Sequence, residues 1–487
     1  MLGDVTNSLK RKQFGVICFV EMWERYAFYG FQTLFMLFLT SQHMSESQGY
    51  LIFGIFSGLL WILPTFGGAL ADKVIGVKRA LIVGGLLLAT GYLLLAFSDS
   101  MQTFMLALAF IVTGNGIFKP APSALVSLIF NKDATQSKSA FTLYYMAVNV
   151  GSTVGGIVGP YIALYSSYKA AFFVAFVGML LSLGNLFLRL KLLKEVNGLK
   201  DNAPLSIKIA IITVAFSVVS IVVCYILLNL EDITPYVIVV VWVLALSYLF
   251  MLAFKTEDIK SRIKQIIGII LFIEAVAFFV VYNQMFSTIT MFAKHNVVNF
   301  VLGIPVSPAT YASLNPIWIV ALSPIIAWFY IALKRANITF DILSKYVVGT
   351  MLAGLAFISL ALASTYFNVN GMVSGNWLIL YFALGSLAEL LVAAMGFAIA
   401  ALYFPKAIVS IVMGVFMISI AQGGNLTGII AQYVAIPERF DSKMASLNIF
   451  INYFYMLGIA CVAIAVVYFF LAIYLRKLAR KHEVDLG

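Results

Sequence analysis

Residues 14–40 read FGVICFVEMWERYAFYGFQTLFMLFLT, a run long enough to cross a lipid bilayer as a helix. The run is almost wholly apolar, yet Glu21, Glu24 and Arg25 stand near its middle. A charged side chain at the centre of a membrane helix costs about 2.5–3.5 kcal/mol on insertion scales. Such residues need partners or a watery cavity, so this stretch predicts a membrane span that contains a polar site.

The rest of the chain is apolar as well. Of its 487 residues, 62% are hydrophobic and 10% are charged, and the mean hydropathy is +1.01. A typical soluble domain is about 25% charged. These figures exclude soluble, disordered, collagen-like and disulfide-rich chains. The apolar runs are about twice as long as a membrane strand and do not alternate, which excludes a β-barrel. We predict an all-α polytopic membrane protein.

Fourteen apolar segments have the length of a membrane span. We predict spans at 14–40, 49–71, 79–98, 102–130, 140–164, 170–190, 206–229, 233–254, 266–292, 311–333, 345–366, 376–404, 408–434 and 449–475. An even number of spans places both termini on one side. Of the 31 lysines and arginines, 25 lie on that side and four on the other, which predicts cytoplasmic termini. The net charge of +11 is therefore a topology signal rather than a nucleic-acid site.

Two long basic connections, around 189–205 and 255–265, divide the chain. They predict an N-terminal six-helix bundle at 1–198, an inserted helix pair with linkers at 199–262, and a C-terminal six-helix bundle at 263–487. This organisation is similar to the major-facilitator plan, in which the substrate site lies between the halves near the midplane. Because no clear sequence repeat is visible, a fourteen-helix protein without internal symmetry stays an alternative.

The ionisable residues of the first span share one stripe of the helix. Glu21 and Arg25 are four residues apart, Glu21 and Glu24 are three apart, and Tyr29 continues the stripe. Two carboxylates beside one guanidinium are expected to titrate as a coupled set. A proton-coupled carrier needs such a set. The alternative is a structural ion pair that locks the helix in its bundle.

Three more ionisable residues lie inside predicted spans. Lys119 stands beside two prolines in GNGIFKPAP, and we expect its ammonium to find a carboxylate unless it snorkels to the interface. Glu389 is the lone acid of its span, which suits a substrate amino group; the alternative is a protonated glutamate bonded to a backbone carbonyl. Glu274 lies about 180° around its helix from Asn283. We expect Glu274 to form a structural or gating pair rather than to contact substrate.

These charges divide between the two halves. Arg25 and Lys119 belong to the N-terminal half, and Glu389 belongs to the C-terminal half. A cavity between the halves would then be positive on one wall and negative on the other. Such a cavity complements a zwitterion, so peptides and amino acids fit it, whereas sugars and lipids do not require this polarity.

Several segments resemble the proton-dependent oligopeptide transporter (POT/PTR) family of the major facilitator superfamily. EMWERYAFYG at 21–30 resembles the first-helix signature of this family, ExxERFxYYG. Further matches run in the family's order along the chain: GGALADKVIGVKRALIVGG at 67–85, GNGIFKP at 114–120, FTLYYMAVNVGS at 141–152 and SLNP at 313–316. Bacterial members typically carry two extra helices between the halves, in agreement with the inserted pair.

The resemblance implies symport of di- and tripeptides with protons, by alternating access, across the bacterial cytoplasmic (inner) membrane. It implies that the proton-coupling cluster is Glu21, Glu24, Arg25 and Lys119. The peptide carboxylate would face Arg25 and Lys119, and the amino terminus would face Glu389. The implied substrate-binding residues are Arg25, Tyr29, Lys119, Asn149, Asn283, Asn315 and Glu389.

Several positions depart from the family pattern, among them Ala393-Ala394 in place of a Ser-Pro pair. Phe28 stands where the signature has Tyr, and Gln32 stands where many members have Arg. Asn283 replaces a glutamate linked to proton coupling, which leaves the stoichiometry open, and Phe416 replaces a frequent tryptophan of the side-chain pocket. These departures keep an alternative function open: a facilitator-fold carrier for an amino acid, nitrate or a peptide-like drug.

Asp72 and Arg79 lie in the short loop between spans two and three, where we expect an inner gate; a simple turn is the alternative. We expect no enzyme, because the three histidines lie at span ends or in tails and no nucleotide-binding loop is present. The expected partners are short peptides, protons and the lipid bilayer, with no nucleic acid. We expect no metal and no cofactor apart from the coupling proton, and a functional monomer.

Overall fold

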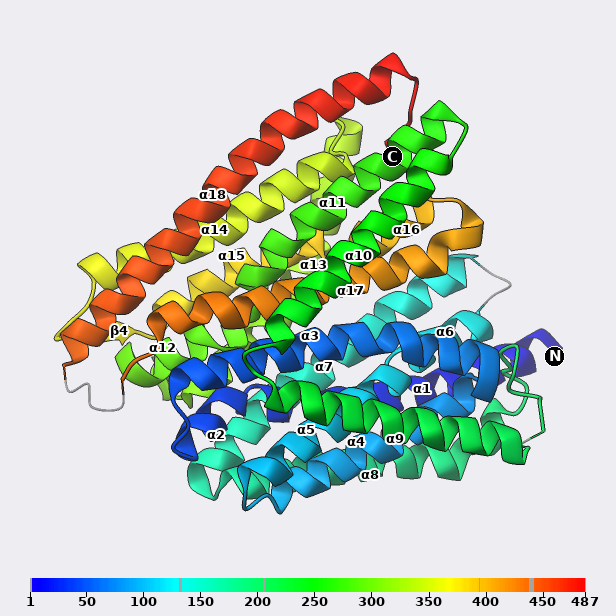
Figure 1. Ribbon diagram of the computed structural model, residues 1–487, viewed down its shortest axis with the longest axis horizontal. Helices are drawn as coiled ribbons and strands as arrows, with labels where there is room; N and C mark the ends of the chain where they lie inside the picture. The colour runs from blue at the N-terminus through cyan, green and yellow to red at the C-terminus, as the bar shows by residue number, and fades with distance from the viewer. Residues whose placement is uncertain (1, 131–133, 205, 394, 438–441, 487) are drawn as a thin grey trace. The chain divides into compact units, whose positions relative to one another are not determined.

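The computed structural model describes residues 2–130, 134–204, 206–393, 395–437 and 442–486. Two of the basic residues counted in predicting cytoplasmic termini, Lys132 and Arg439, lie outside these ranges. The described chain is almost entirely helical (Figure 1), which confirms the all-α prediction.

Thirteen helical segments of the described chain are long and apolar enough to cross a membrane. Helix α1 (Leu2–Gln32) is also long, but Glu21, Glu24 and Arg25 interrupt its apolar part. Counting α1, the number of spans agrees with the fourteen predicted. The cytoplasmic location of the termini stays a prediction.

The chain forms two compact units, of which the first comprises Met1–Phe35 and Leu59–Glu231. Its helical elements are α1, the second part of α3 (Glu46–Leu70), the π-helical turn Ala71–Ile75, α4 (Val77–Ala96), α5 (Met101–Phe118), α6 (Pro120–Ile129), α7 (Ala134–Tyr165), α8 (Tyr168–Arg189), the 3₁₀ turn Leu190–Leu193 and α9 (Ile207–Asn229). Helix α1 packs mainly against α7 and α8, and α4 packs mainly against α5 and α8.

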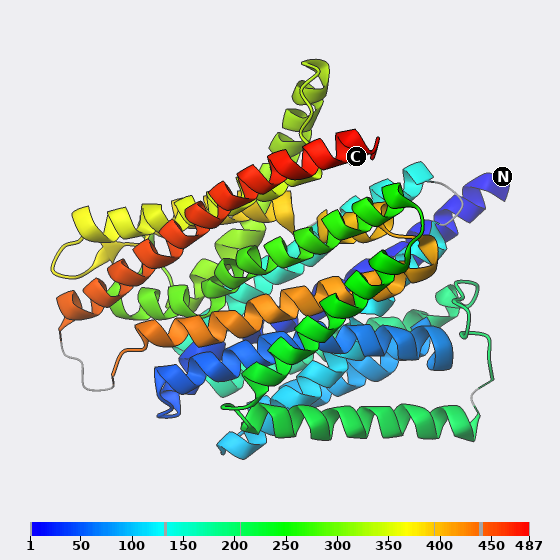
Figure 2. The ribbon, with the colours of Figure 1, turned by 45° about the horizontal axis from the view of Figure 1, so that its top comes forward.

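The second unit comprises Met36–Gly58 and Asp232–Gly487. Its helices are α2 (Phe35–Ser41), the first part of α3, α10 (Thr234–Lys255), α11 (Ile259–Asn283), α12 (Thr288–Asn296), α13 (Leu314–Arg335), α14 (Ile342–Tyr366), α15 (Asn376–Val392), α16 (Met395–Tyr403), α17 (Val409–Ala431) and α18 (Lys443–Lys481). Short 3₁₀ turns are Gln284–Phe286, Pro308–Ser313, Lys406–Ile408 and Gln432–Val434. Helices α14 and α18 run side by side along much of their length (Figure 2).

Four short strands occur in the described chain, all in the second unit. Strand β1 (Val297–Val298) pairs in parallel with β4 (Val373–Ser374). Strands β2 (Phe300–Val301) and β3 (Ile304–Pro305) form an antiparallel hairpin. The β1–β4 pair joins the connection before α13 to the connection before α15.

Polar side chains set where many helices begin. At each of six N-termini the side chain of the preceding residue accepts a hydrogen bond from a backbone N–H of the first turn, which satisfies a donor that the helix leaves free. These residues are Ser100, Ser167, Ser206, Asp258, Asp341 and Ser442.

Glycines of α7 allow close packing against α1. A Cβ atom on Gly151 would clash with the carbonyl oxygen of Met22, and one on Gly155 would clash with that of Tyr26. A Cβ on Gly159 would lie 2.7 Å from the carbonyl oxygen of Gly30. The small-residue ridge therefore brings the two backbones into direct contact, as its spacing indicates.

The inserted helix pair is divided between the units. Helix α9 belongs to the first unit and packs against α5, whereas α10 belongs to the second and packs against α17 and α11. The three-part division at 1–198, 199–262 and 263–487 stays a prediction.

Candidate functional site

The charged cluster of the first unit lies on α1. Arg25 Nε donates to Glu24 Oε2 at 2.5 Å and lies 3.4 Å from Glu21 Oε1. All three side chains are buried. Tyr144, on α7, adds a hydrogen bond to Glu21. The sequence therefore correctly places these three ionisable groups together, but it carries no signal that singles out Tyr144.

Each member of this cluster retains an unused polar atom. Among the described residues, Glu21 Oε2, Glu24 Oε1 and Arg25 Nη2 have no hydrogen-bond partner. A buried polar group without a partner is costly, and a charged one more so. A closed structural ion pair would not leave three such atoms. The arrangement can accept a proton on either carboxylate and an anion on the guanidinium.

Lys119 lies at the break between α5 and α6, where Pro120 begins the new helix. Its Nζ lies 3.3 Å from the centroid of the Trp61 ring. Within the described ranges, no carboxylate lies within 4.0 Å of this nitrogen, so the expected acid partner is not found on the protein. A cation–π contact holds the ammonium instead. Its charge still interacts with those of Arg25 and Glu24.

The other candidates of the first unit differ in their surroundings. Tyr29 is half-buried one turn beyond Arg25 and interacts with it electrostatically. Asn149 donates to the Tyr145 carbonyl of its own helix at 2.8 Å, which leaves its oxygen available. The ring of Phe28 lies 5.2 Å from Arg25 Cζ. The face of the Phe28 ring therefore contacts the guanidinium by a cation–π interaction, although the hydroxyl of the family's tyrosine is missing.

Glu389 is the centre of a polar cluster in the second unit. Asn315 Nδ2, on α13, donates to Glu389 Oε2 at 2.7 Å and to Ser386 Oγ at 3.1 Å. Tyr282, on α11, adds a hydrogen bond to Glu389. In the described part of the chain no basic group lies within 4.0 Å of this carboxylate. Asn315 and Glu389, both chosen from the sequence, are thus in direct contact, and a positive group can still approach.

A pocket opens beside this cluster, within the second unit. It lies between α11, α13, α14 and α15, and its cavity volume is about 30 Å³. Asn315 and Ser386 supply its polar edge. Its aromatic lining residues are Phe278, Tyr282, Phe357, Tyr381 and Phe382. As it stands, the pocket has room only for a small group next to this polar edge.

Asn283 is occupied by protein contacts. Ser57 Oγ donates to Asn283 Oδ1 at 3.2 Å, and Asn283 Nδ2 donates to the Phe279 carbonyl at 2.8 Å. Glu274 lies on the same helix and is buried, with no basic group within 4.0 Å among the described residues. The ion pair expected for Glu274 is therefore absent there. The Tyr468 hydroxyl instead donates to the Glu274 backbone carbonyl at 3.3 Å.

The loop of Asp72 and Arg79 is bound to the segment after α8. Arg79 Nη2 donates to the Ala203 carbonyl at 2.5 Å, and Asp201 accepts from the Lys78 backbone at 3.0 Å. Gly76 has φ 87°, and a Cβ there would lie 2.5 Å from Asp201 Oδ1. Asp72 is exposed. These contacts fix the shape of the loop; the gating role of Asp72 and Arg79 stays a prediction.

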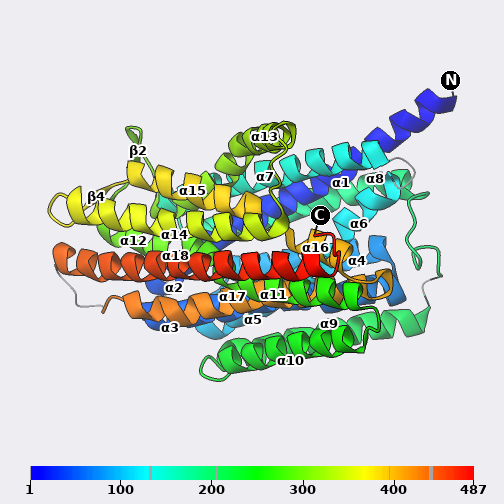
Figure 3. The same cartoon turned by 90° about the horizontal axis from the view of Figure 1, so that it is seen from above.

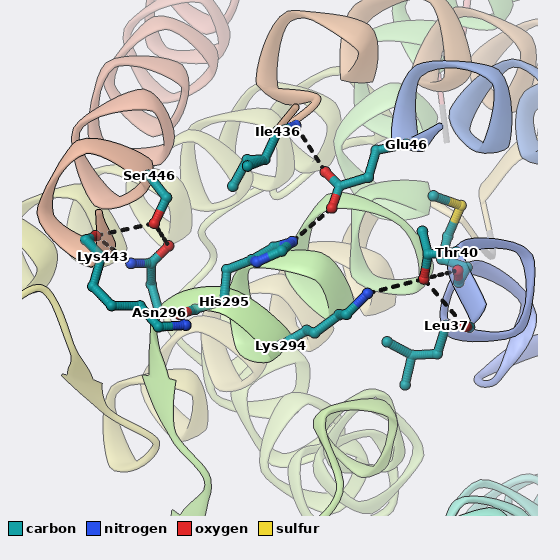
Figure 4. A network of polar contacts seen from close by, with 10 residues as sticks. Leu37, Thr40, Glu46, Lys294, His295, Asn296, Ile436, Lys443 and Ser446 are labelled. Atoms are coloured by element: carbon teal, nitrogen blue, oxygen red, sulfur yellow. Dashed lines mark hydrogen bonds and ion pairs between the residues drawn. The ribbon is translucent and has the colours of Figure 1, made fainter. Parts of the chain in front are cut away.

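A second network lies at the end of α12 (Figure 4). Glu46, at the start of α3, accepts from His295 Nε2 at 2.6 Å and from the Ile436 backbone at 2.9 Å. Lys294 donates to Thr40 at 3.0 Å, and Lys443 donates to the His295 carbonyl at 2.8 Å. Sequence reasoning used His295 only to argue against metal sites, because nothing in the sequence pairs it with Glu46.

Together these features define a polytopic membrane carrier: apolar spans that hold buried, incompletely paired charges, with uncharged groups positioning Lys119 and Glu389. Comparison with known proteins identifies the family. The sequence model of the protein family described as the POT family matches residues 78–446. A dipeptide and tripeptide permease A of Cronobacter turicensis is 35% identical over 98% of this chain and 95% of its own, and one of Proteus mirabilis is 34% identical over 97% of each.

Similarity to solved structures leads to the same family. The chain is similar to tetrameric PepTSo2, with a TM-score of 0.86 and 30% identity over 96% of this chain and 99% of that one. It is also similar to a bacterial homologue of the human drug peptide transporters PepT1 and PepT2, with a TM-score of 0.85 and 31% identity over 97% and 99%. The chain belongs to the POT family. It is a multi-pass protein of the bacterial inner membrane and a transporter, not an enzyme.

Proposed function

We propose that this carrier imports di- and tripeptides together with protons by alternating access. The main observation in support is the incomplete pairing of the charges inside its spans. Arg25 has an unused nitrogen and Lys119 has no acid in contact, whereas Glu389 has no base in contact, all within the described residues. A zwitterionic peptide supplies the missing partners at both ends. The names of the relatives, dipeptide and tripeptide permeases, agree with this substrate class.

In this proposal each end of the peptide has its own site. The carboxylate binds Arg25 and Lys119, and the ammonium binds Glu389. Tyr29, Asn149 and Asn315 contact the remaining polar groups of the peptide. Asn283 joins them by exchanging its contacts with Ser57 and the Phe279 carbonyl for the peptide. The side chain of Asn315 also orients Glu389, because it already donates to that carboxylate.

The coupling proton binds the Glu21–Glu24 pair. One guanidinium cannot fully compensate two neighbouring carboxylates, so the pair takes up and releases a proton as the surroundings change. Peptide binding to Arg25 withdraws positive charge from the carboxylates and favours proton uptake. Proton and peptide binding are thereby linked.

Uptake into proteoliposomes tests the coupling. Labelled dialanine should accumulate under an inward proton gradient, and a protonophore should abolish the accumulation. Glu21→Gln and Glu24→Gln should lose driven uptake and retain exchange of internal for external peptide. If both variants keep normal pH-driven uptake, the coupling cluster is wrong. Competition by single amino acids stronger than by dipeptides would favour the alternative small-solute carrier.

Blocked peptides test the two ends separately. Acetylated dialanine lacks the ammonium, so it should compete far less well than dialanine in the unaltered carrier. In Glu389→Gln, the affinity for dialanine should fall nearly to that for the acetylated peptide. The affinity for the acetylated peptide should hardly change. If acetylation weakens binding as much in Glu389→Gln as in the unaltered carrier, the two losses of affinity are additive, and Glu389 does not hold the amino terminus.

We propose a monomer as the functional unit, and no cofactor apart from the proton. Asp72 and Arg79 remain the proposed inner gate. Since a similar solved structure is tetrameric, single-molecule photobleaching of labelled carriers in vesicles is the appropriate test. One bleaching step per active vesicle supports the monomer, and four steps contradict it.

A further inference from the structure

The second unit exposes two uncharged apolar turns next to each other. Between His295 and Lys334 the sequence has no Asp, Glu, Lys, Arg or His, and this stretch contains the β2–β3 hairpin. The connection between α14 and α15 also lacks charged residues. The pairing of β1 with β4 joins the two turns. We call residues 297–305 and 366–372 the apolar rim.

Large apolar side chains of the rim are directed away from the protein. Leu302, at the hairpin tip, is 78% exposed, and Val369 is 72% exposed. Phe300, Ile304 and Phe367 are exposed as well. Exposed apolar side chains are ordinary when scattered, but a contiguous, uncharged group marks a contact with another apolar phase.

The exposed hairpin is held in place. The Leu302 N–H donates to Asn376 Oδ1 at 3.0 Å, and the Gly375 N–H donates to the Val298 carbonyl at 3.3 Å. Leu302 has φ 49°, an uncommon conformation for a leucine, followed by Gly303 at φ 84°. Side-chain and backbone contacts to the start of α15 thus fix the tip in an extended position.

The position of the rim indicates which phase covers it. The hairpin connects the spans Ile259–Asn296 and Pro308–Arg335, so it begins where one span leaves the bilayer and ends where the next enters. Figure 3 shows the hairpin projecting beyond α15, across the direction in which the helices run. The adjoining α13 exposes Ile317, Val320 and Trp328. This apolar surface continues the lipid-facing surface of a membrane helix.

We propose that the apolar rim inserts into the interfacial layer of the bilayer and that its partner is lipid. Apolar and aromatic side chains without charge are suited to the boundary between headgroups and acyl chains. Through Asn376 the inserted hairpin fixes the start of α15, the helix that carries Glu389. This contact is separate from peptide binding and does not depend on the proposed function.

Fluorescence quenching tests the proposal. Leu302→Cys and Asp99→Cys are labelled with the environment-sensitive dye NBD after the three natural cysteines are replaced by alanine. Asp99 is the control, because it lies in another short turn and its side chain is 85% exposed. In phosphatidylglycerol–phosphatidylethanolamine vesicles, lipids with a spin label high on the acyl chain should quench position 302 at least threefold more than position 99. Aqueous iodide should quench position 99 preferentially.

Two outcomes would overturn the proposal. Equal quenching of both positions by iodide would place the hairpin in water. Protection of position 302 from both quenchers would place it against protein, such as a second copy of the chain. The unaltered chain gives an independent measurement, because a phospholipid with a photoactivatable diazirine near the headgroup should label residues 297–305. Absence of adducts there, with adducts present on α13, would contradict lipid insertion even if the cysteine-free variant fails to fold.

Discussion

Uncharged neighbours hold two charges inside the carrier's spans, those of Lys119 and Glu389. Lys119 lies over an indole ring, and Glu389 is oriented by an amide and a phenol. Such neighbours fix the position of a charge without neutralising it, so the charge stays available to a ligand. An acid beside Lys119, as we expected from the sequence, would have satisfied the ammonium and competed with a peptide carboxylate.

Trp61→Leu should raise the KM for dialanine roughly 2- to 30-fold, the range of a cation–π contact of about 0.5–2 kcal/mol. The ammonium of Lys119 loses the surface that holds it, while its charge remains. The KM of Trp61→Phe should lie between those of the unaltered carrier and Trp61→Leu. Trp328→Leu is the control, because Trp328 is an exposed tryptophan on α13. Equal KM values for Trp61→Leu and Trp328→Leu in uptake assays would show that the ring does not position Lys119.

Asp341 allows a pH-dependent test outside the spans. Burial tends to raise the pKa of this carboxyl, but hydrogen bonds from Arg476 and Ser344 outweigh burial and lower its pKa below 3.8. A lowered pKa stabilises the fold above the unfolded-state value and loses this effect as pH falls through the folded-state value. Asp341→Asn keeps a good helix N-cap and loses the Arg476 ion pair.

The variant should therefore be about 1 kcal/mol less stable at pH 7. The difference from the unaltered chain should shrink as the pH falls from about 4, the pKa of this carboxyl in the unfolded chain, through its lowered pKa in the folded chain. Thermal unfolding of both chains in detergent at several pH values measures this stability difference. A gap that stays constant down to pH 3 would contradict the assignment.

At the scale of elements, the contact of α7 with α1 depends on glycine. Gly155→Ala places a methyl group against the Tyr26 carbonyl, so the helices must separate. Overpacking of this kind costs about 1–3 kcal/mol or more. Gly184→Ala is the matched control, because no atom lies within 4 Å of its added Cβ on α8. Alanine there should stabilise by up to about 1 kcal/mol. Equal thermal midpoints for the two variants would disprove direct backbone contact.

The start of α3 is attached to α12 through Glu46. Glu46→Gln replaces one acceptor oxygen by a donor, so His295 Nε2 and the Ile436 N–H can no longer both donate to this side chain. The expected loss is about 1–3 kcal/mol. Asp99→Asn removes the exposed ion pair with Lys169 and should cost less than about 1 kcal/mol. If both variants unfold at the same temperature, the network of Figure 4 contributes no more than a surface pair.

The predicted spans follow the structure closely where composition alone decides. Predicted spans 206–229 and 233–254 agree with α9 and α10, because both segments are uniformly apolar and lie between more polar stretches of sequence. The sequence did not reveal the breaks within spans: α11 ends at Asn283, and α12 begins at Thr288. Hydropathy does not distinguish a continuous helix from one interrupted by a turn, since both bury the same side chains.

The same limit applies to the site. The spacing of Glu21, Glu24 and Arg25 is a local property of one helix, so the sequence predicts their contact. The partners Trp61, Tyr144 and Tyr282 come from other helices. They belong to residue types that are common in apolar spans, so no pattern selects them before the helices are packed.

For the whole molecule, the driving force sets how far dialanine accumulates. One pH unit supplies about 1.4 kcal/mol per proton, and 100 mV supplies about 2.3 kcal/mol more. With one proton per zwitterionic peptide, the inside-to-outside ratio at equilibrium should reach roughly 500-fold. With two protons it should reach roughly 2.5 × 10⁵-fold. Reversal of flux under clamped gradients distinguishes these values, and a ratio near one with both gradients present would exclude coupling.

The glycine contact between α1 and α7 restricts how the acidic pair can respond to a proton. Since carbonyl oxygens of one backbone lie against α-carbons of the other, neither helix can slide along or rotate about its neighbour without a steric collision. The backbone of Tyr144 consequently keeps its distance from the backbone of Glu21 whichever carboxylate carries the proton. The chemical event must then be transmitted by rotamer changes and rearranged hydrogen bonds, while the two helices travel as one rigid body.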